Sequence, residues 1–292
     1  MSLRNTLPGK AGWRWTAVFL AFAAGLAAML EADRAFAQGG QLAVAPTRVV
    51  FEGRNRSAML SLVNKGSKTA TFRIRVVNLR MDENGNVQEI DKPDAGQQFA
   101  GKLFRYSPRQ VTLKPGAAQA IRLLLRKPKD LAEGEYRSHL MMQNVPDKTG
   151  ISLEQKTGGE GVAIQLVPIF GITIPVIVRH GKTASNVSLS DVSMVAPDEQ
   201  NKLPRLKFTI GRSGNRSAFG DLTATYVNGG TKTVVGQVMR LSVYTPNPKR
   251  TVMMPLRVPD GVKLSGGNIK VTFSETEENG GKLLSEAVMQ VP

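Results

Sequence analysis

The sequence contains no cysteine and only two histidines among its 292 residues. Without cysteine the chain has no disulfides, no thiol chemistry and no cysteine-based metal site, so its hydrophobic core must stabilise the fold. His139 follows Ser138 directly, and adjacent side chains of a strand point to opposite faces, which rules out a hydrogen-bonded nucleophile–base pair. We therefore predict no enzymatic activity, no metal site and no cofactor. We interpret His139 as a surface or half-buried residue, and Glu133 and Glu135 beside a turn as solvated charges.

Long apolar runs are also scarce, and the longest lies near the N-terminus. Three basic residues precede an uncharged apolar run over residues 17–30, and the small residues Ala35 and Ala37 follow it. This run of 14 residues is shorter than the roughly 20 that a membrane-spanning helix needs. Its layout is typical of a signal peptide. We predict that residues 1–37 are cleaved before Gln38 and that the mature form has no transmembrane segment.

Positive charge is in clear excess over negative charge. The formal net charge is +16, and loss of residues 1–37 removes four basic and two acidic residues, which leaves +14. A nucleic-acid partner is one reading of such an excess, but the Lys and Arg residues are scattered among strands and turns. We therefore favour a soluble basic surface and predict no nucleic-acid partner.

Short segments rich in Val, Ile, Leu and Thr alternate with clusters of Gly, Pro, Asn and Asp. This spacing is typical of an all-β sandwich. A break near residue 181 separates two series, so we predict two immunoglobulin-like β-sandwich domains in tandem, over residues 38–181 and 182–292. The first series comprises residues 42–51, 57–63, 69–79, 103–106, 117–126, 136–144 and 162–178. The second comprises residues 186–192, 205–211, 221–227, 233–237, 252–258, 268–274 and 283–290.

The segment over residues 161–179 differs from the other predicted strands in its length. Every even position from 162 to 178 is apolar, which gives the segment one continuous hydrophobic face. A single strand of this length spans roughly 60 Å and would overhang one sandwich, as a strand that pairs with a partner does. The alternative is two ordinary strands broken at Pro168 or Gly171. The pattern leaves both interpretations open.

Several segments resemble, in order and spacing, the periplasmic pilus-assembly chaperones of the chaperone–usher type. These segments are residues 44–51, 57–64, 106–116, 120–123, 134–146 and 174–179. The resemblance extends over about residues 41–181, and departures described below suggest a divergent branch of the family. It implies a periplasmic protein that binds pilin or fimbrial subunits and delivers them to an outer-membrane usher.

The mechanism that the resemblance implies is donor-strand complementation, in which an edge strand of the first domain completes an immunoglobulin-like subunit that lacks its last strand. By the family's pattern, the inserted side chains come from the seventh strand. Here they are expected to be Ile164, Leu166, Phe170 and Ile172. The same exposed strand is a candidate surface for self-association.

The family also holds the terminal carboxylate of the subunit with an Arg on the first strand and a Lys late in the seventh. Arg48 matches the Arg. The Lys position falls on Pro175, so the second anchoring charge is missing. Arg179 or His180 could lie near the cleft as substitutes, and the planar fork of an arginine can hold a carboxylate by itself.

A second function class uses the same sandwiches as a secreted adhesin or carbohydrate-binding module. It predicts a site at the loop ends with clustered aromatic or Asp and Asn side chains. Aromatic residues make up 6% of the sequence, and few lie in the predicted loops. We therefore favour the chaperone.

Overall fold

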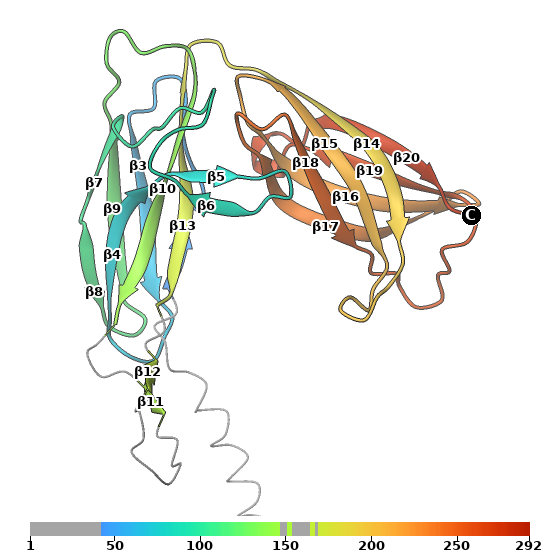
Figure 1. Cartoon of the computed structure of the whole chain (residues 1–292), viewed down its shortest axis with the longest axis horizontal. Helices are drawn as coiled ribbons and strands as arrows, with labels where there is room; N and C mark the ends of the chain where they lie inside the picture. The colour runs from blue at the N-terminus through green and yellow to red at the C-terminus, as the bar shows by residue number, and fades with distance from the viewer. Residues whose placement is uncertain (1–41, 147–150, 154–163, 167–168) are drawn as a thin grey trace, which may run out of the picture.

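The computed structural model describes residues 42–146, 151–153, 164–166 and 169–292, and these form two β-sandwiches (Figure 1). The all-β architecture with two sandwiches is therefore confirmed. Among the described residues the helical structure consists of the short 3-10 helix η1 (Glu277–Asn279), and none of it could cross a membrane. The predicted signal peptide over residues 1–37 lies outside the described residues.

The first sandwich packs two sheets around one core. One sheet contains, in spatial order, β1 (Leu42–Ala45), β3 (Ser57–Asn64), β9 (Ala118–Leu125) and β7 (Phe104–Ser107). The other contains β2 (Val49–Phe51), β13 (Gly171–His180), β10 (Gly134–Val145), β4 (Ala70–Val77) and β8 (Gln110–Leu113). Alternate side chains point inward, as the period of two requires, and the buried core includes Phe51, Leu60, Phe72, Ile121 and Leu140.

The segment predicted as one strand over residues 42–51 is two strands in different sheets. β1 pairs antiparallel with β3, whereas β2 pairs parallel with β13 of the opposite sheet. The chain therefore crosses the sandwich between Ala45 and Val49. Arg48 lies at the end of this crossing, directly before β2.

The second sandwich has its own core. Its sheets are β14 (Ser185–Val195), β15 (Arg205–Gly214) and β18 (Lys249–Pro255), against β17 (Thr231–Val243), β16 (Ala218–Asn228), β19 (Asn268–Ser274) and β20 (Leu283–Gln290). Their buried side chains include Leu206, Phe208, Leu222, Val271 and Phe273. Because this core is separate from that of the first sandwich, each sandwich buries its own apolar surface.

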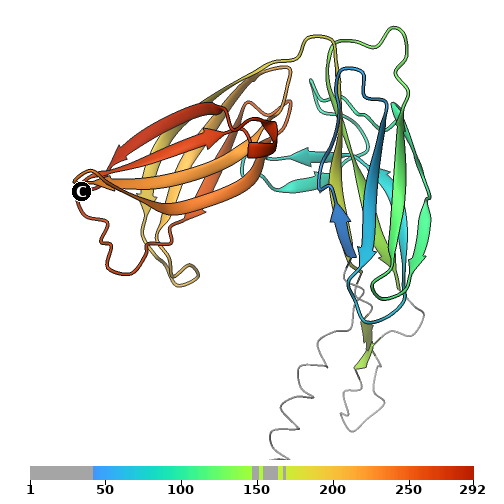
Figure 2. The same ribbon diagram turned by 180° about the vertical axis from the view of Figure 1, so that it is seen from behind.

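A hairpin of the first sandwich, β5 (Leu79–Met81) with β6 (Val87–Glu89), bridges the two domains in both views (Figures 1 and 2). Its tight turn contains the pair Asn84-Gly85, with Gly85 at φ +87°, a positive φ that an Asn-Gly turn favours. The backbone N–H of Thr251 donates to the carbonyl of Glu83 at 2.7 Å, and Asn247 Nδ2 donates to the carbonyl of Met81 at 2.7 Å. The turn is thus fixed to the second domain.

The predicted long strand over residues 161–179 is interrupted. β12 (Ile164–Leu166) pairs with β11 (Ile151–Leu153) in a small separate hairpin, and β13 begins only at Gly171. Ile169 and Phe170 before it belong to neither strand. The continuous overhanging strand is therefore wrong, and the alternative of two strands is what the structure shows. Gly171 at the start of β13 is consistent with a strand boundary here, because glycine weakens a strand interior.

Candidate functional site

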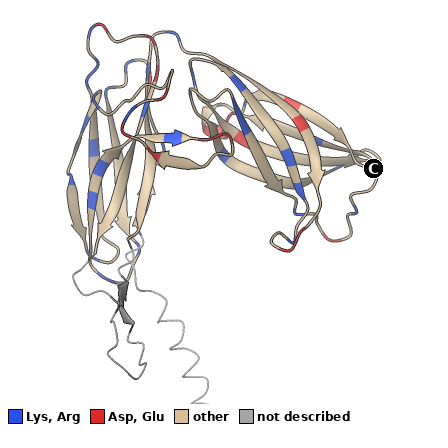
Figure 3. Cartoon of the chain, in the orientation of Figure 1, with Lys and Arg blue, Asp and Glu red and all other residues tan. Residues whose placement is uncertain are grey.

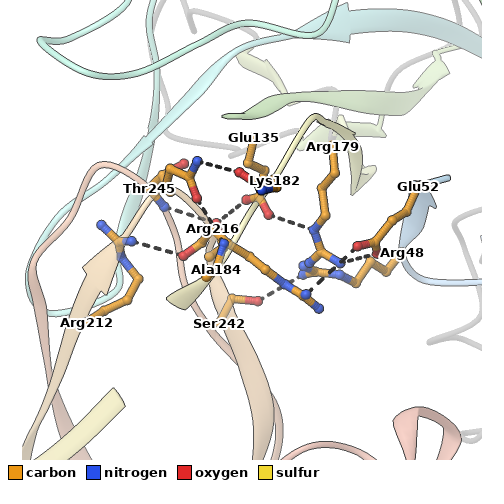
Figure 4. A network of polar contacts seen from close by, with 12 residues as sticks. Arg48, Glu52, Glu135, Arg179, Lys182, Ala184, Arg212, Arg216, Ser242 and Thr245 are labelled. Atoms are coloured by element: carbon orange, nitrogen blue, oxygen red, sulfur yellow. Dashed lines mark hydrogen bonds and ion pairs between the residues drawn. The ribbon is translucent and has the colours of Figure 1, made fainter. Parts of the chain in front are cut away.

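A cleft of about 680 Å³ lies between the two sandwiches. Its lining is polar and carries several charged side chains from both domains. The first domain contributes Arg48, Glu52 and Arg179, and the second contributes Arg216, Arg240, Glu278 and Lys282. Figure 4 shows the network of contacts on one wall of this cleft.

Arg48 reaches across the domain boundary. Its Nη1 donates to Oγ of Ser242 at 3.2 Å, and its guanidinium lies 4.2 Å from the ring centroid of Phe219. Its Nη2 is buried and has no hydrogen-bond partner among the described residues. Burial lowers the pKa of Arg48 below its ordinary value, but a guanidinium stays charged in proteins. A buried, charged donor with a free N–H is well suited to bind an anion.

Arg179 forms the centre of a second set of contacts in the cleft. Its Nε donates to Glu135 at 3.1 Å, and its Nη1 donates to Glu52 at 2.7 Å. Oγ of Ser217, from the second domain, donates to the other oxygen of Glu135 and accepts the backbone N–H of Thr245 at 3.0 Å. The guanidinium therefore has two carboxylate partners, and the network joins the two domains.

The interpretation of Glu135 as a solvated charge is wrong. Its side chain has no exposed surface, and the antiparallel register of β10 and β13 puts Glu135 opposite Arg179. Glu133, two residues before it, is exposed as expected. A buried carboxylate needs such a partner, since an unpaired buried charge is costly.

His139 is also more buried than expected, with 4% of its surface exposed. Its ring lies edge-on to that of Tyr244 at 6.2 Å. Burial, together with the charges of Arg137 and Arg48, lowers the pKa of His139 to about 3. His139 is therefore a neutral part of the domain interface at physiological pH. His180 lies half-buried at the end of β13, outside the lining of the cleft.

The register of β2 and β13 shows which residue of this chain lies beside Arg48, where the family has its lysine. Val49 of β2 pairs with Val176 of β13, so Arg48 and Pro175 precede that pair on neighbouring strands. Pro175 offers no charge beside Arg48. Arg48 and Arg179 both line the cleft, and their roles toward a ligand stay predictions.

The expected donor residues divide between β12, β13 and the segment between them. Phe170 is 54% exposed and Ile169 is 57% exposed, whereas Ile172 packs against the core of the first sandwich. The side chains of Ile164 and Leu166 lie outside the described part of the structure. Their contribution therefore stays a prediction.

The outer edge of β13 is open next to these residues. On one side β13 pairs with β10 along its length, and on the other it pairs with β2 at Val176–Val178. Among the described residues, no strand pairs with Gly171 to Pro175 on that second side. Unpaired backbone N–H and C=O groups at such an edge are a template for a further strand.

Residues 41–180 match the family model of the pili and flagellar-assembly chaperone, PapD N-terminal domain. Through its first domain, this chain belongs to the PapD-like pilus-assembly chaperones. The match covers the same segment as the resemblance found in the sequence. The family consists of chaperones and not of enzymes, in agreement with the sequence analysis.

Solved chaperone structures are similar to the chain at low identity. The YadV chaperone is 12% identical with a TM-score of 0.41, and the match covers 86% of this chain and 99% of that one. The SafB chaperone, in complex with the Salmonella enterica SafA pilin, is 13% identical with a TM-score of 0.41 and coverages of 87% and 98%. The Pseudomonas aeruginosa CupB2 chaperone is 13% identical with a TM-score of 0.40 and coverages of 85% and 98%. No curated protein matches the chain.

The described residues contain no group of three or more His, Asp or Glu side chains able to hold a metal ion. Lys and Arg lie on strands and loops of both sandwiches (Figure 3).

Proposed function

We propose that this chain is a periplasmic chaperone that captures pilus subunits by donor-strand complementation and delivers them to an outer-membrane usher. The observation that carries the proposal is the open edge of β13 in a domain of the PapD-like family. SafB, a chaperone with a similar fold, was solved with a pilin bound.

The open edge supplies backbone groups, and the segment before it supplies apolar side chains. Phe170 is exposed despite its size, and its backbone is fixed, since its N–H donates to Asn144 Oδ1 at 2.6 Å and its carbonyl accepts the N–H of Asn144 at 2.9 Å. A large apolar side chain on a fixed backbone is suited to enter a groove in a partner. With Ile164, Leu166 and Ile172 it forms the proposed donor set.

Arg48 lies close to this edge and supplies the anchor for the terminal carboxylate of the subunit. Its Nη2, which has no hydrogen-bond partner in the described structure, has the charge and the unused N–H that a carboxylate needs. The stack on Phe219 and the bond to Ser242 fix its orientation. Strand pairing and carboxylate binding would then set the register of the captured subunit together.

Co-expression with candidate subunits encoded beside its gene tests this function. The parent protein should co-purify with a subunit, and Phe170→Asp or Leu166→Asp should reduce capture by about tenfold or more, as for a central interface residue. Leu124→Asp is the matched control, because Leu124 is 50% exposed on β9, away from the open edge.

Arg48→Ala belongs in the same experiment, with urea unfolding to show that the variant folds. Unchanged capture by all three variants (Phe170→Asp, Leu166→Asp and Arg48→Ala) would refute donor-strand binding at this edge. If Leu124→Asp alone abolished capture, the subunit would bind to the opposite sheet, which contains β9, and not to the open edge of β13.

The proposed compartment rests on residues 1–37. The mature protein is expected in the periplasmic fraction with Gln38 at its N-terminus, which intact-mass measurement can determine. Recovery of the full chain in the cytoplasm would contradict the signal peptide. Self-association through the open edge would appear in size-exclusion chromatography as a dimer of this chain. Addition of a pilus subunit, which competes for the same edge, should dissociate that dimer.

A further inference from the structure

We infer that Arg216 of the second domain supplies the second cation of the carboxylate site, so that the site combines one arginine from each domain. This inference rests on the proposed function, because it names a further residue of the same anchor. It addresses the missing lysine, because Pro175, which takes the place of that lysine on β13 beside Arg48, carries no charge.

Arg216 lies next to Arg48 in the cleft. Both side chains line it, and in Figure 4 the side chain of Arg216 extends toward that of Arg48. The positive charges of Arg179 and Arg216 add to the effect of burial in lowering the pKa of Arg48, which requires that they are close. Two neighbouring guanidinium groups repel each other unless an anion lies between them.

The backbone at Arg216 is held in place, although its side chain is 34% exposed. Arg212 Nη1 donates to the carbonyls of Gly214 and Arg216, at 2.7 and 2.9 Å. Ser217, the next residue, is fixed by its bonds with Glu135 and Thr245. The turn before β16 therefore presents the Arg216 side chain to the cleft from a rigid base.

The other arginines of the cleft are already engaged. Arg179 has two carboxylate partners, Glu135 and Glu52. Arg240 donates from Nη1 to both oxygens of Glu278, at 3.1 and 3.2 Å. Within the described parts of the chain, the ion-pair partner of the Arg216 side chain is Glu52, and its Nη1 lies 3.9 Å from that carboxylate, at the limit of an ion pair.

Glu52 is the carboxylate that a ligand must compete with. It lies between Arg179 and Arg216, with a side chain that is 50% exposed. Burial alone would raise the pKa of Glu52, but the hydrogen bond and charge of Arg179 and the charge of Arg216 lower it overall. Glu52 is thus ionised at neutral pH and partly neutralises Arg216. Removal of its charge should strengthen the binding of an external carboxylate.

Sodium acetate is the probe for this site, because it presents a carboxylate without the β-strand of a pilus subunit. The mature protein with ¹⁵N-labelled arginine side chains is titrated with acetate at constant ionic strength, with chloride as the balancing anion. The Nε–H signals of Arg48 and Arg216 should shift with one common Kd. Arg216→Ala should weaken that Kd by about tenfold, the value of one charge-assisted hydrogen bond, and Arg216→Lys should restore part of it.

Two further variants separate a direct contact from a structural role. Glu52→Gln should tighten acetate binding severalfold, an effect in the opposite direction that loss of structure does not produce. Arg257→Ala removes an exposed arginine of the same domain outside the lining of the cleft and should leave the Kd unchanged. Lys282→Ala tests the remaining cation of the cleft and should change the Kd less than Arg216→Ala does.

The outcome distinguishes this inference from the proposed function. If Arg48 shifts with acetate and Arg216→Ala leaves the Kd within about twofold, a change too small for a lost charge-assisted bond, Arg216 is not part of the site. The absence of any saturable shift at Arg48 overturns the inference as well. Subunit capture that depends on Phe170 but not on Arg216 would preserve the chaperone function and remove only this inference. Acetate binding that depends on Arg216, without capture of any subunit, would preserve this inference and remove the chaperone function.

Discussion

Arg48 and Ser242 are 194 positions apart in the sequence, yet Nη1 of the first donates to Oγ of the second at 3.2 Å. The arginine that the family resemblance assigns to the first domain is therefore held by the second domain. Phe219, also of the second domain, lies under the same guanidinium. The second sandwich thus has a role in the site itself, because it orients the residue proposed to bind the carboxylate of the subunit.

Ser242→Ala should destabilise the protein and disturb Arg48. The substitution leaves the partly buried Nη1 of Arg48 without its acceptor, at a cost of about 1–3 kcal/mol. Urea unfolding measures this loss. Ser193→Ala, at an exposed position of β14, should change the stability by less than about 0.5 kcal/mol. Equal stability of the two variants would mean that the bond between Arg48 and Ser242 contributes nothing.

Glu135→Gln should loosen the contact between the domains. The substitution removes the buried negative charge between Arg179 and Ser217, and breaking a buried ion pair costs about 3 kcal/mol or more. Urea unfolding should show the loss, and small-angle scattering should show a larger radius of gyration. Glu133→Gln, at an exposed neighbour on the turn, serves as the control. A Glu135→Gln protein as stable and compact as the parent would contradict the assigned role of the network.

The stability should fall at acidic pH because of His139. Its pKa is about 3 in the folded protein, against an ordinary value of about 6.5 in the unfolded chain. Below the unfolded value the unfolded chain binds a proton that the folded protein does not, so the free energy of unfolding decreases as pH falls. Between about pH 7.5 and about pH 5 the loss from this residue is about 2 kcal/mol.

Urea unfolding at both pH values, with the parent and His139→Gln, isolates this contribution. The variant should lose less stability on acidification than the parent does. His180→Gln should retain the full pH dependence, since it leaves His139 in place. A parent and a His139→Gln protein with the same pH dependence would show that His139 is not held neutral by the fold.

Gly85→Ala should weaken the link between the hairpin and the second domain. A Cβ at Gly85 would collide with the guanidinium of Arg250, whose Nη1 donates to the carbonyl of Ser242 at 2.6 Å. Gly53→Ala is the matched control, because Gly53 also has a positive φ, of +61°, but open space around it. Both variants bear the left-handed strain of about 1 kcal/mol, so urea unfolding reports the extra loss at Gly85. Identical losses would argue against hairpin docking.

Much of the fold follows from local patterns that a sequence displays. Alternating apolar residues predict the long strands of both sandwiches, and the Asn84-Gly85 pair predicts the tight turn between β5 and β6. β8 is absent from the predicted strands. The crossing between β1 and β2 is also missed, since both of its sides look like strand.

The cleft is less accessible to sequence reasoning. Arg48 is found through a family motif, but its partners Phe219 and Ser242 belong to the other domain, and no spacing rule connects them. Arg179 and Glu135 could be paired only once the register of β10 and β13 is known. No sequence motif assigns Arg216 to the cleft. Charge interactions between segments far apart in the sequence can therefore be identified only from the three-dimensional structure.

Hydrogen–deuterium exchange on a purified complex with a captured subunit tests the donor-strand claim most directly. In the free protein the outward amides of Gly171–Ile174 lack a strand partner among the described residues and should exchange fast. Binding of a strand of the subunit should slow them by about tenfold or more, as expected for amides that enter a β-ladder. The inner strand β4 should show little change. A stable complex in which these amides exchange as fast as in the free protein would contradict the account.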